Sequence, residues 1–337
     1  MKYSIIVPVF NRPDEVDELL ESLSHQTFQD FEVVIVEDGS QVTCKDVCDK
    51  YADILDLHYY YKENSGPGQS RNYGVDRAQG EYVIILDSDA VTPPGFMQAI
   101  RDELQRQPSD AWGGPDAAHE SFTDIQKAIS YAMTSFFTTG GIRGGKKQLD
   151  KKFYPRSFNL GVRREVYQQL GGFSKERFSK MSLYGEDIDF SLRIYKGGYS
   201  CRLFPEAWLW HKRRTDFRRF WRQVYNSGYA RINLWRKYPE ALKPVHALPS
   251  VFTLGVAGLV LLSAVGRLLM YYRGNDQWRW LCLWPWVPIV LYVLLIFIDS
   301  SVRNRSLKVG LISIPAVFVQ LVGYGVGFLE SWLTKRA

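Results

Sequence analysis

The sequence predicts an α/β domain built on a mostly parallel sheet and followed by a helical region that belongs in a membrane. Two observations predict the first part. Continuous apolar, β-rich runs recur along the amino-terminal half, and segments with helical spacing of apolar residues separate them. One observation predicts the second part: the last 91 residues contain three uncharged windows, each about as long as the hydrocarbon core of a bilayer requires.

The first elements form a βαβ unit. YSIIVPVF (3–10) and FEVVIV (31–36) are apolar throughout, as strands buried on both faces of a parallel sheet are. The segment between them, PDEVDELLESLSH, begins with Pro13, which suits the first turn of a helix. Its apolar side chains fall on one helical face: Val16, Leu19, Leu20 and Leu23.

Further elements extend this unit. A third strand is expected near Leu55–Tyr61 and a helix near Pro67–Ala78, before the apolar strand in GEYVIILDSDA (80–90). Ligands of such open sheets bind outside the carboxyl ends of the strands. Polar residues follow three of these ends: Asn11 and Arg12, Glu37 and Asp38, and Asp87 and Asp89.

Charge divides the chain into two parts. The hydrophobic share of 46% is ample for a core and argues against disorder. Residues 1–210 hold 24 Lys+Arg against 31 Asp+Glu, a net charge of −7, whereas residues 211–337 hold 18 against 5, a net charge of +13. Nucleic acid binding would explain a basic half, but the apolar windows within that half point elsewhere.

These windows predict transmembrane helices. No charge occurs in Ala247–Gly266, Trp280–Ile298 or Val309–Leu329, so spans are expected at about 247–271, 279–298 and 309–331. Buried core helices are the alternative. A cluster of tryptophans at one boundary favours spans with an aromatic belt: Trp278, Trp280, Trp284 and Trp286.

The side of the membrane follows from the flanking residues. MKYSIIVPVF is too short for a signal peptide, so residues 1–246 are expected in the cytoplasm, and the basic loop SSVRNRSLK is expected to return there. Three spans would leave the carboxyl terminus outside, although Arg273 and Arg279 in the preceding loop leave that step open. We therefore expect a multi-pass membrane protein with residues 1–246 in the cytoplasm.

A basic, aromatic segment precedes the first window. Residues 211–246 combine apolar and aromatic side chains at helical spacing with 10 Lys+Arg against 2 acids between positions 211 and 243. An amphipathic basic helix directly before a span is typical of an interfacial helix on anionic headgroups. Membrane lipids, and no nucleic acid, are therefore the expected partners of the basic half.

Several motifs together indicate a family. SIIVPVFNR, VIVEDGS, ENSGPGQSRNYG, LDSDA, LGGF and GEDIDFSLRIYKGG occur in the order found in family 2 glycosyltransferases of the GT-A fold, and the chain resembles the bacterial membrane-anchored members with C-terminal transmembrane helices. The resemblance covers roughly residues 3–240. The absence of a GxGxxG fingerprint after the first strand counts against a dehydrogenase.

The resemblance implies a domain organisation. Residues 1–210 would form the Rossmann-like GT-A catalytic domain, a mixed, mostly parallel sheet flanked by helices, with a nucleotide-binding half at about 1–110 and an acceptor half at about 111–210. Residues 211–246 would form the interfacial helix, and residues 247–337 the three transmembrane helices.

The resemblance also implies a nucleotide-sugar donor and a divalent cation, Mg²⁺ or Mn²⁺, which neutralises charge on the departing diphosphate. It assigns Asp89 to the metal, Asp87 to the metal or the ribose, and Ser88 to a donor contact. His211 matches a third metal contact found in part of the family. The alternatives are that the aspartates cap a turn and that the histidine lies at the membrane surface.

Other donor contacts follow from the same resemblance. Asp38 would accept the uracil N–H, and Arg71 would steady the nucleotide or its phosphates, with a structural ion pair to Asp87 or Asp38 as the alternative. Glu37 departs from the two aspartates of many relatives and is left out. The remaining donor-binding residues implied are Pro8, Phe10, Arg12, Asn64 and Gly66, with Asn72 in the same segment as the last two.

The acceptor half centres on GEDIDF. An inverting transfer needs a carboxylate that takes the proton from the acceptor hydroxyl; by resemblance this base is Asp187, and Glu186 orients the acceptor. The alternative is that both acids cap the helix that follows. Residues 138–152, rich in glycine and lysine, would form either a lid or a solvated connection.

The expected activity is transfer from a nucleoside diphosphate sugar, most simply a UDP-sugar, to a hydroxyl of a lipid-linked saccharide in bacterial surface or exopolysaccharide synthesis. A polyprenyl-phosphate sugar transferase is the nearest alternative, but it would not need a hydroxyl base. A processive synthase is another, yet three spans are few for a pore and the QxxRW motif is missing. A non-catalytic membrane adaptor would not need the acids.

Overall fold

The computed structural model describes residues 2–117, 122–140, 153–176, 178, 184–273 and 278–334. The chain divides into two units, which are described separately: Met1–Glu120 with Gly144–Lys212, and Ser121–Arg143 with Arg213–Ala337. Residues 141–152, most of the segment expected to form either a lid or a solvated connection, lie outside the described residues.

A seven-stranded sheet forms the centre of the first unit, in the order β3-β2-β1-β4-β8-β6-β9. Its first four members are mutually parallel, as predicted, and β8 runs antiparallel to both of its neighbours while β9 is parallel to β6. The strands are β1 (Tyr3–Val9), β2 (Phe31–Asp38), β3 (Asp56–Lys62), β4 (Tyr82–Leu86), β6 (Ala111–Gly113), β8 (Asn159–Arg163) and β9 (Cys201–Leu203).

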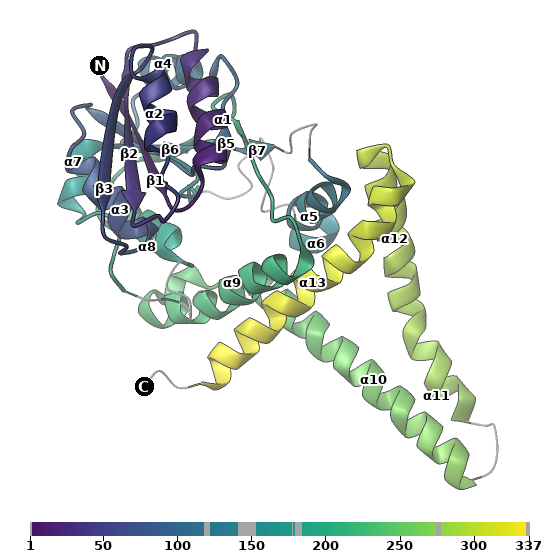
Figure 1. The fold of residues 1–337 in the computed structure, drawn as a ribbon. Helices are drawn as coiled ribbons and strands as arrows, with labels where there is room; N and C mark the ends of the chain where they lie inside the picture. Colours follow the sequence, from purple (N-terminus) through teal and green to yellow (C-terminus); the bar gives the residue numbers. More distant parts are fainter. Residues whose placement is uncertain are drawn as a thin grey trace. The chain divides into compact units, whose positions relative to one another are not determined.

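Helices cover both faces of this sheet (Figure 1). Side chains alternate between the two faces of a strand, so Ile5 and Val7 of β1 join one apolar cluster and Ile6 joins the other. The first cluster includes α1 (Pro13–Ser24), α2 (Lys45–Tyr51) and α4 (Phe96–Arg106), and the second includes α3 (Pro67–Val75), α7 (Arg164–Gln169) and α8 (Glu186–Lys196). Burial on both faces explains why the central strands β1 and β4 are mostly apolar.

A small second sheet joins distant parts of the first unit. β10 (Leu209–His211) lies between β5 (Ala90–Val91), to which it is antiparallel, and β7 (Asp116–Ala117), to which it is parallel. Because β5 directly follows Asp89, this pairing brings the end of β10 next to the end of β4.

The second unit is helical. It contains α5 (Asp124–Thr134), α6 (Phe136–Thr139), α9 (Phe217–Lys237), the short 3₁₀ helices η1 (Pro239–Ala241) and η2 (Pro244–Ala247), α10 (Leu248–Arg273), α11 (Arg279–Leu283), η4 (Trp284–Trp286), α12 (Val287–Asn304) and α13 (Leu307–Leu333). Three of its described stretches are long and apolar enough to cross a membrane: Pro244–Arg273, Arg279–Asn304 and Leu307–Leu333. They coincide with the three predicted windows.

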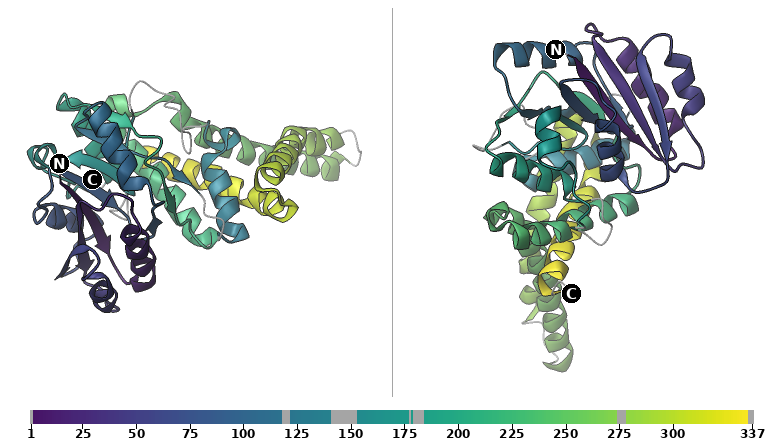
Figure 2. Two further views of the ribbon diagram at one scale, coloured as in Figure 1. Left: turned by 90° about the horizontal axis from the view of Figure 1, so that it is seen from above. Right: turned by 90° about the vertical axis from the view of Figure 1, so that its left-hand side faces the viewer.

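Close packing joins α13 to α9 (Figures 1 and 2). A Cβ added at Gly228 of α9 would lie 2.1 Å from the backbone oxygen of Tyr324, and one at Gly327 of α13 would lie 2.1 Å from that of Tyr225. At Gly323 an added Cβ would lie 2.6 Å from the side chain of Val224. Glycines at these positions therefore let the two backbones approach, as the GxxxG spacing of Gly323 and Gly327 permits.

Candidate active site

Strand β4 delivers two carboxylates to its carboxyl end. The strand is fully buried between β1 and β8, and the turn that follows it contains Asp87, Ser88 and Asp89. Ser88 and Asp89 are buried, while the side chain of Asp87 is 30% exposed. The rigid strand therefore holds both acids at the edge where ligands of open α/β sheets bind.

Each aspartate divides its two oxygens between an arginine and a histidine. Asp89 Oδ2 lies 2.8 Å from Arg12 Nη1, and its Oδ1 lies 3.1 Å from His211 Nε2. Asp87 Oδ1 lies 2.9 Å from Arg71 Nη2, and its Oδ2 lies 3.7 Å from the same histidine nitrogen. The arginines thus orient the carboxylates so that one oxygen of each faces His211.

Strand pairing positions His211. It pairs with Ala90 in the small sheet, and the backbone N–H of Lys212 donates to the carbonyl of Asp89 at 3.2 Å. The imidazole stacks on Phe158, with ring centroids 4.7 Å apart and planes 17° apart. Both contacts hold the ring with its Nε2 toward the aspartates.

The three side chains fit a divalent cation. One ligand atom from each of Asp87, Asp89 and His211 lies within 4.8 Å of the others. Carboxylate oxygen and imidazole nitrogen are accepted ligands of Mn²⁺-type cations. Two ligands at right angles around a cation with bonds of about 2.1 Å would be about 3 Å apart, and the observed separation of Asp89 Oδ1 and His211 Nε2 is 3.1 Å.

A second group with metal-binding side chains lies at the other end of the sheet. It consists of Glu32, Asp56 and His58, at the starts of β2 and β3. Glu32 Oε1 is already used by the Ser4 hydroxyl and by the backbone N–H of Gln79 at 2.6 Å. Because this group stands at the amino ends of the strands and fastens a turn, the group at Asp87 and Asp89 is the functional candidate.

Electrostatics favour the ionised form of Asp89. Burial alone would raise the pKa of this carboxyl, but the neighbouring His211 and Arg12 outweigh that cost and hold the pKa well below its usual range. The group is therefore a carboxylate at neutral pH, as a metal ligand must be.

Asp38 organises the loop before α3. Its Oδ1 accepts the backbone N–H of Ser65 at 2.9 Å and an ammonium hydrogen of Lys62, and its Oδ2 accepts the N–H of Gly66 at 2.9 Å. Asn64 donates to the backbone carbonyl of Asp38 at 2.7 Å. Burial would raise the pKa of Asp38, but these bonds lower it. The loop residues predicted to bind donor are thus joined to Asp38, and its contact with the base stays a prediction.

The two remaining predicted donor contacts lie on and after β1. Phe10 directly follows the strand and is 50% exposed, so its ring is available to a ligand. Pro8 is half-buried within the strand, opposite Val36 of β2.

Arg71 links the two groups of acids. It is 6% exposed on α3, and besides its contact with Asp87 its Nη1 lies 3.9 Å from Glu186 Oε2. Its guanidinium also lies over the ring of Phe173, 5.1 Å from the centroid. The structural ion pair with Asp87 that sequence reasoning left as an alternative is therefore present.

The acids at the start of α8 have different surroundings. Glu186 is buried against Gly68 of α3, where an added Cβ would lie 2.6 Å from Oε2. Burial raises the pKa of Glu186 to about 7, with Arg71 opposing this and the acids Asp187 and Asp189 adding to it.

Asp187 is more open. Its Oδ2 lies 3.2 Å from Arg156 Nη1, and its Oδ1 accepts the N–H of Ile188 at 2.9 Å. Both acids lie in the first turn of α8, as the helix-dipole alternative requires, but the N-cap residue is Gly185, and the Asp187 carboxylate stays partly accessible.

Sequence reasoning missed three residues of this region. They are Phe158 beneath His211, Arg156 beside Asp187 and Gly68 beside Glu186. Gly68 lies within the motif ENSGPGQSRNYG, but no spacing rule shows which distant side chains Gly68, Arg156 and Phe158 touch.

The chain is similar to known glycosyltransferases. Residues 4–171 match the family described as Glycosyl transferase family 2. An uncharacterized glycosyltransferase of Rickettsia felis is 38% identical over 137 residues, which are 41% of this chain and 22% of that protein. The glucosyl-dolichyl phosphate glucuronosyltransferase of Haloferax volcanii is 25% identical over 257 residues, 72% of this chain and 80% of that protein.

Coverage of relatives is uneven. The chain covers 13% of a Rickettsia bellii relative and 22% of the Rickettsia felis protein. Among solved structures, the mannosyltransferase PcManGT of Pyrobaculum calidifontis, in complex with GDP-Man and Mn²⁺, is similar with a TM-score of 0.57 at 18% identity, over 94% of this chain and 86% of that one. Through residues 4–171 the chain belongs to glycosyl transferase family 2, and it has the GT-A fold of that family.

Proposed function

We propose that this protein is an inverting glycosyltransferase that moves a sugar from a nucleoside diphosphate sugar, a UDP-sugar, to a hydroxyl of a lipid-linked saccharide. The observation that carries the proposal is the convergence of Asp87, Asp89 and His211 on one point at the carboxyl edge of the sheet. Family membership supports the reaction class.

On the donor side, Asp89, Asp87 and His211 would hold Mg²⁺ or Mn²⁺. The cation supplies neutralisation of the charge on the departing diphosphate. Arg12 and Arg71 keep the carboxylates oriented, Ser88 contacts the donor between them, and the loop ordered by Asp38 presents Asn64 and Gly66. The Mn²⁺ in the PcManGT complex supports the choice of cation.

On the acceptor side, Asp187 takes the proton of the attacking hydroxyl, because it is a partly accessible carboxylate. Glu186 orients the acceptor. With a pKa of about 7 it is partly protonated near neutral pH and can then donate a hydrogen bond to an acceptor oxygen. No second carboxylate is needed as a nucleophile in a single displacement.

The lipid-linked acceptor rests on two supports. The second unit carries three apolar helices of membrane-spanning length. The name of the Haloferax volcanii relative, glucosyl-dolichyl phosphate glucuronosyltransferase, includes a lipid-linked sugar. We place the protein in the bacterial inner membrane with its first unit in the cytoplasm, where nucleotide sugars are made, and its product in surface or exopolysaccharide assembly.

The experiment is a screen of purified full-length protein against UDP- and GDP-sugars, with Mn²⁺ or with a chelator, by release of nucleoside diphosphate. We expect release from one nucleotide class only with metal, and loss of release in Asp89→Ala. Asp102→Ala, on the exposed face of α4, is the matched control and should behave as wild type. Metal-independent release that survives Asp89→Ala would overturn the proposal.

A further inference from the structure

We infer that α13 does not cross the membrane. Instead α13 lies along the membrane surface beside α9, and only the hairpin formed by α10 and α11–α12 penetrates the bilayer. The end of α13 is then on the same side of the membrane as the first unit. Length and composition alone predict a third span here, so the inference rests on contacts within the second unit.

Both ends of α13 are fastened to helices that precede the first span. At its start, Lys308 Nζ lies 2.7 Å from Asp124 Oδ2 of α5. At its end, Arg236 of α9 donates to the carbonyls of Ser331 at 2.7 Å and Thr334 at 2.9 Å. A 27-residue helix is about 40 Å long, so a spanning helix would place these two ends on opposite sides of a core about 30 Å thick.

The middle of α13 lies beside exposed arginines. Gly323 contacts Val224 and Trp221 of α9, and Trp221 itself is 36% exposed. Three arginines in the same turns of α9 are exposed: Arg218, Arg219 and Arg222. If α13 spanned the bilayer, these guanidinium groups would lie near its centre, where a charge is costly. At the surface the same groups reach anionic headgroups and Trp221 reaches the acyl boundary.

Contacts with the hairpin occur at its base. Gly325 of α13 packs against Pro249 and Thr253 in the first turns of α10, and Phe318 lies 5.7 Å from Phe252 between ring centroids. Nearer its start, α13 contacts the last turns of α12, where the hydroxyls of Ser300 and Ser313 are 2.7 Å apart. Figure 1 shows α13 crossing α10 at a steep angle rather than running along it.

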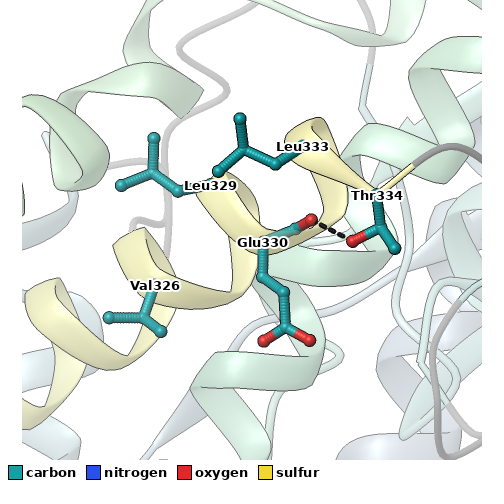
Figure 3. A pocket seen from close by; sticks show the side chains of 5 residues that line it. All are labelled: Val326, Leu329, Glu330, Leu333 and Thr334. Atoms are coloured by element: carbon teal, nitrogen blue, oxygen red, sulfur yellow. Dashed lines mark hydrogen bonds between the residues drawn. The ribbon is translucent and has the colours of Figure 1, made fainter.

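α13 is more buried within the protein than the other two apolar helices. Only 6% of the most apolar window is buried within the protein for Pro244–Arg273 and for Arg279–Asn304, against 50% for Leu307–Leu333. Few residues of the first two helices are therefore buried within the protein, whereas half of this window in α13 is buried. The uncovered part of α13 includes a shallow apolar pocket lined by Val326, Leu329 and Leu333 with Glu330 and Thr334 (Figure 3). An uncovered apolar surface of this kind suits the acyl boundary of one leaflet.

Loop charge does not decide between the two arrangements. Arg303, Arg305 and Lys308 lie at the base of the hairpin, but Arg267, Arg273 and Arg279 lie toward its tip. The positive-inside rule therefore gives a weak preference, and the contacts of α13 carry the inference.

The test is the labelling of single cysteines in the full chain by a membrane-impermeant maleimide. Cys201 and Cys282 are replaced by serine, and Cys44 and Cys48 stay because they are buried. The three reporters are Thr334→Cys at the end of α13, Val302→Cys at the base of the hairpin and Tyr272→Cys toward its tip. Inverted and right-side-out vesicles from a bacterial host are labelled in parallel.

We expect Thr334→Cys and Val302→Cys to react from one face and Tyr272→Cys from the other. Reaction of Thr334→Cys from the same face as Tyr272→Cys would overturn the inference. A second measurement avoids cysteine variants: green fluorescent protein or alkaline phosphatase is fused to either end of the unaltered chain. Fluorescence without phosphatase activity at both ends supports the inference, and phosphatase activity at the carboxyl end alone contradicts it.

Discussion

The two acidic groups of the first unit contain similar side chains in opposite electrostatic surroundings. Asp89 is buried beside Arg12 and His211, and these neighbours hold its pKa below the usual range in spite of burial. Burial raises the pKa of Glu186 to about 7, because Arg71, 3.9 Å away, shares its charge with Asp87 and only partly opposes the effect of burial.

In the proposed function, this difference lets one fold serve two tasks. A metal ligand must stay ionised, whereas Glu186, when protonated near neutral pH, can donate a hydrogen bond to the acceptor. Arg71 connects the two groups, so its charge influences both.

The largest effect on the acceptor group is expected from Asp187→Asn. Sugar transfer should fall by about 10²–10⁴-fold, the usual contribution of a general base, while donor hydrolysis should fall less because water does not need to be oriented by this carboxylate. Glu186→Gln is the matched variant and should reduce transfer less than Asp187→Asn. Rates of transfer and hydrolysis measured on the same preparations check this. If Asp187→Asn still transferred sugar to a polyprenyl phosphate at the wild-type rate, the result would instead support the alternative function, that of a polyprenyl-phosphate sugar transferase.

A smaller effect is expected at the metal group from Arg12→Gln. Loss of the ion pair with Asp89 should weaken Mn²⁺ activation by about 10–100-fold, as removal of groups that orient metal ligands does. Saturating Mn²⁺ should restore most of the rate, because the three ligands remain. Arg77→Gln, at an exposed position in the turn after α3, serves as control. An unchanged activation constant in Arg12→Gln would show that Arg12 does not orient the ligand.

The smallest effect concerns stability and pH. The folded state raises the pKa of Glu186 from 4.5 to about 7, so it binds this proton more tightly than the unfolded chain does. The free energy of unfolding therefore falls as pH rises from about 4.5 to 7, by at most about 3 kcal/mol. Glu186→Gln has no carboxyl to ionise, so its free energy of unfolding does not fall in this way. Its melting temperature should exceed that of wild type at pH 8, and the difference in melting temperature should be smaller at pH 5. Equal differences at both pH values would contradict the raised pKa.

Local sequence patterns predicted the elements of the first unit well. The apolar run Tyr82–Leu86 is a central strand, and the helix after Pro13 buries Val16, Leu19, Leu20 and Leu23 as its spacing indicated. Ile188, Leu192 and Ile194 of α8 are likewise buried. These features depend on residues a few positions apart, so their period is visible in the chain.

The arrangement of the site depends on contacts between distant residues. The pairing of His211 with Ala90, the stacking of Phe158 and the division of the carboxylate oxygens between arginines and histidine cannot be read from local spacing. The same limit applies to α13, whose composition is that of a span. The spacing of Gly323 and Gly327 permits close packing with another helix, but the identity of that helix, α9, is a property of the fold.

The most direct test of the central claim is Mn²⁺ binding by the purified full-length protein in the presence of UDP, measured by the loss of the electron paramagnetic resonance signal of free Mn²⁺. We predict one saturable site in wild type and in Asp102→Ala, and loss of that site in Asp89→Ala. His211→Ala should weaken it. Equal binding by wild type and Asp89→Ala would contradict the assignment of the metal to the group formed by Asp87, Asp89 and His211.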